Sequence, residues 1–260
     1  MINLKGHGAL VTGGSKGIGK AIALALAQAG ANVVITSRHA KEAMNTLRQL
    51  RRKSVKAEYI QSDLSVLENT RRVVTEAFQF FPKLDILVNN AGTFCDKDFL
   101  ENTPAEWDRL VNLNLRGMYF TSQTFARRLI AMKRPGKIIM VGSTNSFVAE
   151  ENSTIYDTTK GGIAMMVKSL AVTLAKHRIH VNGIAPGLIY TPLTAYLQNP
   201  KFKLIRQNYE RTIPLGRIGR PEDCGGAVVF LASGLADYVT GQFIVIDGGL
   251  ISTQIGPPAS

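Results

Sequence analysis

Two residues with acid/base potential, Tyr156 and Lys160, stand four positions apart at the start of a long helical pattern. Residues at i and i+4 share one helix face, so we expect the phenol and the ammonium to point into one site. A free tyrosine has a pKa of about 10, too high for a base near neutral pH. A cation about 4 Å away, at an effective dielectric constant near 20, contributes roughly 4 kcal/mol and could lower that pKa by up to about three units before desolvation acts against it. Such a phenol could serve as general acid and base; a solvated surface pair is the alternative.

A glycine-rich segment, Thr12-Gly13-Gly14-Ser15-Lys16-Gly17-Ile18-Gly19, follows the first apolar run and precedes an alanine-rich helical pattern. A strand, a glycine turn and a helix in this order let the backbone approach a pyrophosphate, whose charge then lies at the helix N-terminus. The spacing is T-G-x-x-x-G-x-G rather than G-x-G-x-x-G. It predicts a dinucleotide site, with a tight turn that binds nothing as the alternative.

The end of the second expected strand, Val34-Ile35-Thr36-Ser37-Arg38, contains a cation and no carboxylate. A carboxylate at this place accepts the ribose 2′-hydroxyl of NAD, whereas an arginine accommodates the 2′-phosphate of NADP. Ser37 and Arg38, together with Lys16, therefore favour NADP(H) over NAD(H), and a solvated Arg38 is the alternative. Asp63, which follows the third expected strand, either caps a helix or accepts from the adenine amine.

Short apolar segments alternate with amphipathic helical patterns, and these elements must position the residues above. We expect strands at 9–12, 32–36, 57–61, 84–89, 137–143, 179–185 and 243–246, and helices at 18–29, 40–53, 66–80, 104–133, 154–177 and 221–233. Strands that are apolar on both faces and alternate with helices predict an α/β fold, namely a single doubly wound Rossmann domain over 1–260 with a parallel seven-stranded sheet and helices on both faces. The Pro- and Tyr-rich region of about 188–220 predicts a substrate lid, and 256–260 a frayed end.

Composition and charge narrow the class of protein. The chain has 260 residues, of which 45% are hydrophobic and 19% charged, and a formal net charge of +12. Its basic residues are dispersed, so we expect them to attract anionic cofactors and substrates, and we expect no nucleic-acid partner. Two cysteines without metal-ligand spacing predict no metal site and fit a reducing compartment. The lack of a signal-peptide pattern and of a long apolar run predicts a cytoplasmic protein with no membrane partner.

The chain resembles the short-chain dehydrogenase/reductase family over nearly its whole length. Six features in the family's order carry the resemblance: the T-G-x-x-x-G-x-G segment, Asn89-Asn90-Ala91-Gly92, Asn114, the set Ser143, Tyr156 and Lys160, the segment Asn182-Gly183-Ile184-Ala185-Pro186-Gly187 followed by Thr191, and Asp247-Gly248-Gly249. The resemblance implies an NAD(P)-dependent oxidoreductase that interconverts a ketone and a secondary alcohol.

The resemblance also implies a role for each matching residue. Tyr156 would donate the proton as hydride arrives from C4 of the nicotinamide, and Ser143 would hydrogen-bond the substrate oxygen. Lys160 would bind the nicotinamide ribose and lower the pKa of Tyr156, Asn114 would hold a water in a proton relay, and the segment 186–191 would place the carboxamide. The expected cofactor-binding residues are Gly13, Ser15, Lys16, Gly17, Ile18, Gly19, Ser37, Arg38, Asp63, Leu64, Asn90, Ala91, Gly92, Tyr156, Lys160, Pro186, Gly187, Ile189 and Thr191. The expected substrate-binding residues are Ser143, Asn145, Glu150 and Tyr156.

The substrate stays open between two classes. One is a 3-oxoacyl thioester, with Lys133-Arg134 and Lys176-His177-Arg178 as places to receive an acidic acyl carrier protein. The other is a sugar or polyol, with Asn145 and Glu150 as ligands of its hydroxyls. A basic surface around Arg134 would favour the first and a polar pocket built on Asn145 and Glu150 the second. A non-catalytic NADP(H)-binding sensor is the alternative of another class, although such a chain would be expected to lack Tyr156 or Lys160. The resemblance further implies a homotetramer, formed through the helices at 104–133 and 154–177.

Overall fold

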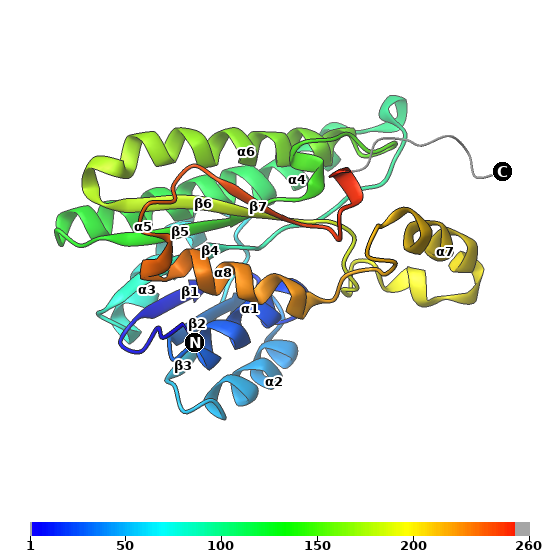
Figure 1. The fold of residues 1–260 in the computed structure, drawn as a ribbon. Helices are drawn as coiled ribbons and strands as arrows, with labels where there is room; N and C mark the ends of the chain where they lie inside the picture. Colours follow the sequence, from blue (N-terminus) through cyan, green and yellow to red (C-terminus); the bar gives the residue numbers. More distant parts are fainter. Residues whose placement is uncertain (1, 253–260) are drawn as a thin grey trace.

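The computed structural model describes residues 2–252, so the frayed end expected at 256–260 lies outside them. Seven strands form one parallel sheet in the order β3-β2-β1-β4-β5-β6-β7 (Figure 1). The strand order reverses between β1 and β4, and ligands of open α/β sheets bind in the crevice outside the carboxyl ends at such a point. The predicted doubly wound Rossmann fold is thus confirmed. The strands are β1 (Gly8–Val11), β2 (Asn32–Ser37), β3 (Ala57–Gln61), β4 (Leu84–Asn89), β5 (Gly136–Val141), β6 (Ile179–Pro186) and β7 (Phe243–Ile246).

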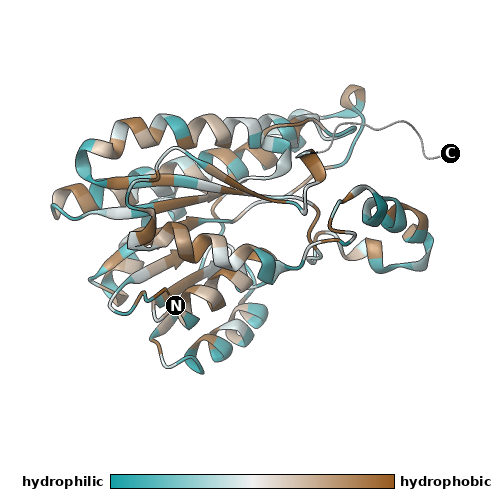
Figure 2. Ribbon diagram, viewed as in Figure 1, coloured by the Kyte–Doolittle hydropathy of each residue, from teal (hydrophilic) through white to brown (hydrophobic). Residues whose placement is uncertain are grey.

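Helices cover both faces of the sheet (Figure 1). On one face lie α1 (Gly17–Gln28), α2 (Ala40–Arg51) and α8 (Gly225–Ala232); on the other lie α3 (Leu67–Phe80), α4 (Pro104–Val111), α5 (Met118–Ala131) and α6 (Thr154–Leu174). Each layer has its own buried apolar cluster, which includes Ile22 and Val228 on the first face and Phe125 and Ile163 on the second. Fully burying one such side chain contributes about 1.5–3 kcal/mol. Figure 2 shows the matching hydropathy, with strands that are mostly hydrophobic.

The helix expected at 104–133 is interrupted, which corrects the prediction. A π-helical turn, Asn112–Gly117, separates α4 from α5. At Gly117 a Cβ would lie 2.6 Å from the carbonyl oxygen of Leu64, so the turn packs against the β3–α3 connection where a larger residue does not fit. Single π turns inside helices are frequent at functional sites, and this one carries Asn114.

The region expected to form a lid is an excursion with a small core of its own. It contains one α-helix, α7 (Lys203–Thr212), and two short 3-10 helices at Ala195–Gln198 and Pro200–Phe202. Buried Leu197, Ile213 and Ile218 form a separate apolar cluster in this region. In Figure 1, α7 stands apart from the body of the sheet, and Figure 2 shows it as largely hydrophilic. Among the helices of residues 2–252, none is long and apolar enough to cross a membrane.

Candidate active site

The glycine-rich segment forms the turn between β1 and α1 and lines a cavity of about 290 Å³. Gly13 and Gly17 have φ angles of +64° and +55°, which side-chain-bearing residues rarely adopt. A Cβ on Gly19 would collide with Asn90 Nδ2 and with the carbonyl oxygen of Gly13. Asn90 Nδ2 donates to the carbonyl oxygens of Thr12 at 2.9 Å and Gly13 at 3.2 Å, so the loop after β4 braces the turn. This cradle, which added side chains would fill, fits a dinucleotide pyrophosphate at the start of α1.

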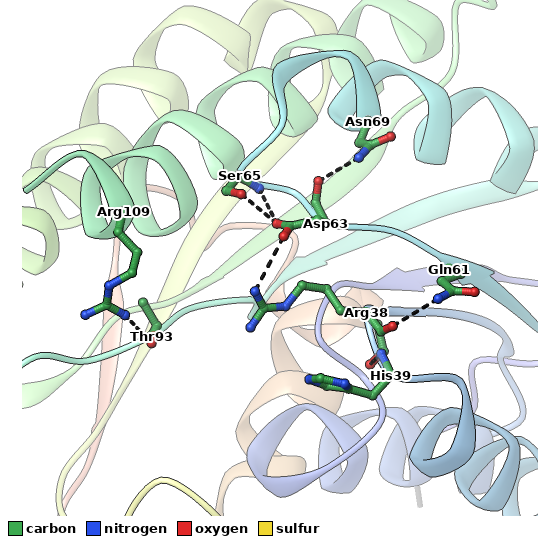
Figure 3. A network of polar contacts seen from close by, with 9 residues as sticks. Arg38, His39, Gln61, Asp63, Ser65, Asn69, Thr93 and Arg109 are labelled. Atoms are coloured by element: carbon green, nitrogen blue, oxygen red, sulfur yellow. Dashed lines mark hydrogen bonds and ion pairs between the residues drawn. The ribbon is translucent and has the colours of Figure 1, made fainter. Parts of the chain in front are cut away.

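The loops after β2 and β3 form the other end of this cavity (Figure 3). Arg38 Nη1 lies 3.4 Å from Asp63 Oδ2, and both side chains are partly exposed. Asp63 Oδ1 accepts hydrogen bonds from Ser65 N at 3.0 Å and Ser65 Oγ at 2.7 Å, which closes the turn that leads to α3. Burial raises the pKa of Asp63, but the Ser65 hydrogen bonds and Arg38 outweigh it and hold this pKa below its ordinary value. Asp63 therefore closes a turn and lines the cavity at once, so its two expected roles are compatible.

Tyr156 and Lys160 lie in the first turns of α6, beside the carboxyl end of β5. Lys160 Nζ donates to the carbonyl oxygens of Val141 and Gly142, both at 3.1 Å, and lies 5.3 Å from the centroid of the Tyr156 ring. Burial lowers the pKa of Lys160 to about 8. Phe94 packs edge-on against Tyr156, with ring centroids 5.1 Å apart. The helical spacing thus brings the phenol and the ammonium into one site.

The pKa of Tyr156 moves in the direction opposite to the expected one, to about 12. Burial of the phenol is the largest cause, a hydrogen bond with Ser143 opposes it, and the carboxylates of Glu150 and Asp157 raise it further. The expectation from sequence counted the attraction of Lys160, whereas desolvation of the phenolate wins here. A phenol that stays protonated is the form that can donate a proton to a substrate oxygen.

Ser143 is held by a chain of hydrogen bonds that begins at Asp157. Ser143 Oγ donates to Asn145 Oδ1 at 2.8 Å and accepts from Asn145 N at 3.2 Å. Asn145 Nδ2 in turn donates to Asp157 Oδ1 at 2.7 Å, and Asp157 Oδ2 accepts from Glu150 N at 3.0 Å. Asp157 thereby anchors the loop that carries Ser143 at two places. The prediction from sequence missed this residue, and its position directly after Tyr156 was the signal that could have found it.

Asn114 is fully buried in the π-helical turn and bridges two segments. Its Oδ1 accepts from Thr93 N at 2.8 Å, and its Nδ2 donates to Thr93 O at 2.9 Å and to Thr159 Oγ1 at 3.2 Å. Thr159 directly precedes Lys160, so Asn114 lies near Tyr156 and Lys160. A role of Asn114 in a water relay stays a prediction.

A second cavity, of about 340 Å³, adjoins the first, and Tyr156 lines both. Its walls come from the loop after β5, the segment after β6 and the lid region. Ser143, Asn145 and Glu150, which were expected to bind the substrate, line this second cavity. Tyr196 and Tyr209, from the Pro- and Tyr-rich region that was expected to form a lid over the pocket, also line it.

The expected cofactor-binding residues divide between the two cavities. Ile18, Tyr156 and Thr191 line both of them, while Pro186, Gly187 and Ile189 line the second. The remainder line the first cavity: Gly13, Ser15, Lys16, Gly17, Gly19, Ser37, Arg38, Asp63, Leu64, Asn90, Ala91, Gly92 and Lys160.

The two basic clusters considered for an acyl carrier protein lie at the other edge of the sheet. Lys133-Arg134 precede β5 and Lys176-His177-Arg178 precede β6, so both stand at the amino ends of their strands. Arg134 Nη1 donates to the carbonyl oxygen of Pro82, which comes shortly before β4. Tyr156 lies at the carboxyl end of the sheet, so neither cluster borders the substrate side of its own chain.

Comparisons with known proteins agree with this geometry. A family model described as enoyl-(acyl carrier protein) reductase matches residues 13–251. The chain is 38% identical over 250 residues to the 3-oxoacyl-[acyl-carrier-protein] reductase FabG of Aquifex aeolicus, over 96% of this chain and 99% of that protein. It is 36% identical to the L-rhamnose-1-dehydrogenase of Scheffersomyces stipitis, over 95% of this chain and 96% of that protein. A crystal structure of a gluconate 5-dehydrogenase from Burkholderia cenocepacia, in complex with NADP and tartrate, matches with a TM-score of 0.90 at 34% identity, over 97% of this chain and 98% of that one.

Proposed function

This chain belongs to the short-chain dehydrogenase/reductase family and is an oxidoreductase acting on CH–OH donors with NAD(P), and we propose that it uses NADP(H) to interconvert a ketone and a secondary alcohol, with Tyr156 as acid and base. The observation that carries the proposal is that Tyr156 lines both cavities. One phenol thus stands between the dinucleotide cradle and the substrate side. The alternative of a non-catalytic sensor is set aside, because the chain keeps both Tyr156 and Lys160.

The residues of the chain divide the proton chemistry among them. A dinucleotide held by the glycine turn would supply or accept the hydride through its nicotinamide ring. Tyr156 donates its proton to the substrate oxygen during reduction and takes one from the alcohol during oxidation. Ser143 turns its hydroxyl from Asn145 toward the substrate oxygen and stabilises the charge that develops there. Lys160 has three N–H donors. Two of them bond the carbonyl oxygens of Val141 and Gly142, and the third would bond the nicotinamide ribose.

Replacing Tyr156 with phenylalanine tests the acid/base role. Phenylalanine keeps the ring that packs against Phe94 and removes only the hydroxyl. We expect turnover to be lost while NADPH binding, followed by the fluorescence of the bound cofactor, stays unchanged. A panel of ketones, sugars and 3-oxoacyl thioesters, assayed by NADPH absorbance, supplies the substrates. A variant that keeps most of its rate would refute the assignment.

The 2′-phosphate of NADP is assigned to Arg38, with Ser37 and Lys16 beside it. The guanidinium is half-exposed at the end of the cavity, and its contact with Asp63, at 3.4 Å, is long enough to yield to a phosphate. We expect Arg38→Asp to lower the ratio of kcat/KM for NADPH over NADH at least about tenfold, because a charge-assisted hydrogen bond contributes about 1.5–3 kcal/mol. The matched control is Arg52→Asp, on the exposed end of α2. An unchanged ratio in Arg38→Asp would contradict the assignment.

Of the two substrate classes, we propose the sugar or polyol. The wall built on Asn145 and Glu150 supports it, since both side chains line the cavity and can bond hydroxyls. The 3-oxoacyl thioester is the second candidate, and the similarity to FabG of Aquifex aeolicus supports that one. Activity with acetoacetyl thioesters that exceeds activity with every sugar would reverse the order.

Assembly as a homotetramer and a cytoplasmic location stay predictions. Helix α6 exposes Met165 and Val172, and α5 exposes Tyr119, on the two helices that the expected interface would use. Light scattering coupled to size-exclusion chromatography measures the mass in solution.

A further inference from the structure

The two cavities beside Tyr156 differ in charge. The first cavity, which the glycine-rich turn lines and which we call the cofactor cavity, is lined by the cations Lys16, Arg38 and Lys160 and by one carboxylate, that of Asp63. The second cavity, which adjoins the first at Tyr156, is called the substrate cavity. Among the described residues that line it, the only charged side chain is the carboxylate of Glu150. No cation is among the described residues that line this cavity, in spite of the positive net charge of the chain.

Glu150 is held in place at the cavity wall from two directions. Its Oε1 accepts from the hydroxyl of Tyr209 in α7 at 3.2 Å, and its Oε2 accepts from Asn145 Nδ2 at 3.2 Å. Neither partner carries a positive charge, so neither forms an ion pair with this exposed carboxylate. Both partners line the same cavity, which places Glu150 within reach of a substrate that contacts either one.

The field of Glu150 reaches each phenol around the cavity. Burial is the largest cause that raises the pKa of Tyr209 to about 12 and that of Tyr156 to about 12, and the Glu150 carboxylate acts in the same direction on both. The pKa of Tyr196 is raised by burial, by Glu150 and by Asp96. The negative potential thus extends from the lid to the catalytic oxygen.

Cations near the lid do not compensate for this carboxylate. Lys201, Lys203, Arg206 and Arg211 belong to the lid segment, but none of them lines the cavity, and Arg206 lies 3.9 Å from Glu210 of its own helix. Lys97, in the loop after β4, pairs with Glu106 at 3.1 Å.

We propose that the substrate is an uncharged polyhydroxylated ketone or alcohol, and that Glu150 excludes its anionic counterparts such as aldonates and sugar phosphates. This inference rests on the proposed function, because it takes the cavity beside Tyr156 as the substrate site. An anionic substrate would lose hydration there without gaining a counter-ion and would face Glu150. A neutral sugar would instead donate hydroxyl hydrogen bonds to Glu150 and exchange others with Asn145 and Tyr209.

Matched pairs of substrates that differ in charge test the inference. One pair is L-sorbose and 5-keto-D-gluconate, and an achiral pair is ethyl acetoacetate and acetoacetate. We expect kcat/KM to be at least about tenfold higher for the neutral member of each pair. In Glu150→Gln this ratio should fall about tenfold, the size expected for one nearby charge partly screened by solvent. Glu151→Gln, a neighbouring exposed carboxylate outside the cavity lining, should leave the ratio unchanged.

A binding measurement separates this inference from the proposed function. The Tyr156→Phe protein, loaded with NADPH, is titrated with both members of each pair, and the cofactor fluorescence reports binding. Tighter binding of the neutral member supports the inference even if the wild-type protein turns over neither member, in which case the proposed function fails alone. Equal or tighter binding of the anion, or a ratio that Glu150→Gln does not change, would overturn the inference. A protein that binds neither member would count against both.

Discussion

Replacing Asp157 with asparagine tests whether this carboxylate positions Ser143, the proposed ligand of the substrate oxygen. Asp157 accepts from Asn145 Nδ2 at 2.7 Å and from Glu150 N at 3.0 Å, and Asn145 in turn accepts the Ser143 hydroxyl at 2.8 Å. The amide of asparagine has one oxygen instead of two, so it can keep one of the two contacts. The other contact would bring two donors together, and the loop that carries Ser143 would lose an anchor.

The size of the effect follows from the lost contact. A hydrogen bond to a charged group contributes about 1.5–3 kcal/mol, and the partial exposure of Asp157 places it near the lower end. At about 1.4 kcal/mol per tenfold, we expect kcat to fall about tenfold when Ser143 is no longer held. The KM for NADPH should not change, because Asp157 does not line the cofactor cavity.

The pH profile distinguishes a positioning role from a loss of folding. The negative charge of Asp157 is one of the causes that raise the pKa of Tyr156, so its removal lowers that pKa. Oxidation of the alcohol needs the deprotonated phenol, and its rate therefore rises with pH through this pKa. In Asp157→Asn the rise should occur at lower pH, whereas Thr158→Ala, a change at the next and exposed position, should leave both rate and profile as in the wild type. A variant with unaltered kcat and an unmoved profile would refute the positioning role.

Two further predictions concern the glycine turn and the buried lysine. Gly19→Ala should raise the KM for NADPH about tenfold, because the methyl group collides with Asn90 and Gly13; Gly161→Ala, which meets open space, should leave KM unchanged and stabilise α6 by about 0.5–1 kcal/mol in denaturant unfolding. Burial lowers the pKa of Lys160 from 10.5 to about 8, so the wild type gains stability as pH rises between these values. Lys160→Met should therefore be more stable than wild type at pH 7, by up to about 3 kcal/mol, and lose that advantage by about pH 10; a constant difference would contradict the shift.

The fold could be predicted from the sequence because its determinants are local and periodic. The apolar runs at 84–89 and 179–185 correspond to β4 and β6, with bounds that differ from the expected ones by one residue at most. A strand that is buried on both faces has apolar residues at nearly every position, so its sequence is easy to recognise. The glycine turn was predictable for the same reason, because its positive φ angles at Gly13 and Gly17 restrict the residue type.

The parts that were missed depend on contacts between distant segments. The π-helical turn around Asn114 keeps the apolar pattern on either side of it, and it brings Gly117 close to the Leu64 carbonyl oxygen, a contact that the local sequence does not contain. The direction of the Tyr156 pKa depends on desolvation, which a spacing between two residues does not contain. The role of Asp157 depends on its hydrogen bonds to Asn145 and Glu150, which belong to the loop before α6.

The net charge of the whole chain differs in sign from the charge that lines the substrate cavity. A value of +12 predicted attraction of anionic cofactors and of anionic substrates alike. The fold separates the two, because β2 and the glycine turn bring Arg38 and Lys16 to the cofactor cavity, while the loop after β5 brings Glu150 to the substrate cavity. Other basic residues, such as Arg134 and Arg178, precede β5 and β6 at the amino ends of these strands, on the opposite side of the sheet from Tyr156. Solvent screens exposed charges that are farther apart than the Debye length of about 8 Å. A substrate that enters beside Tyr156 therefore meets a local negative charge, and its selection depends on Glu150 rather than on the charge of the whole chain.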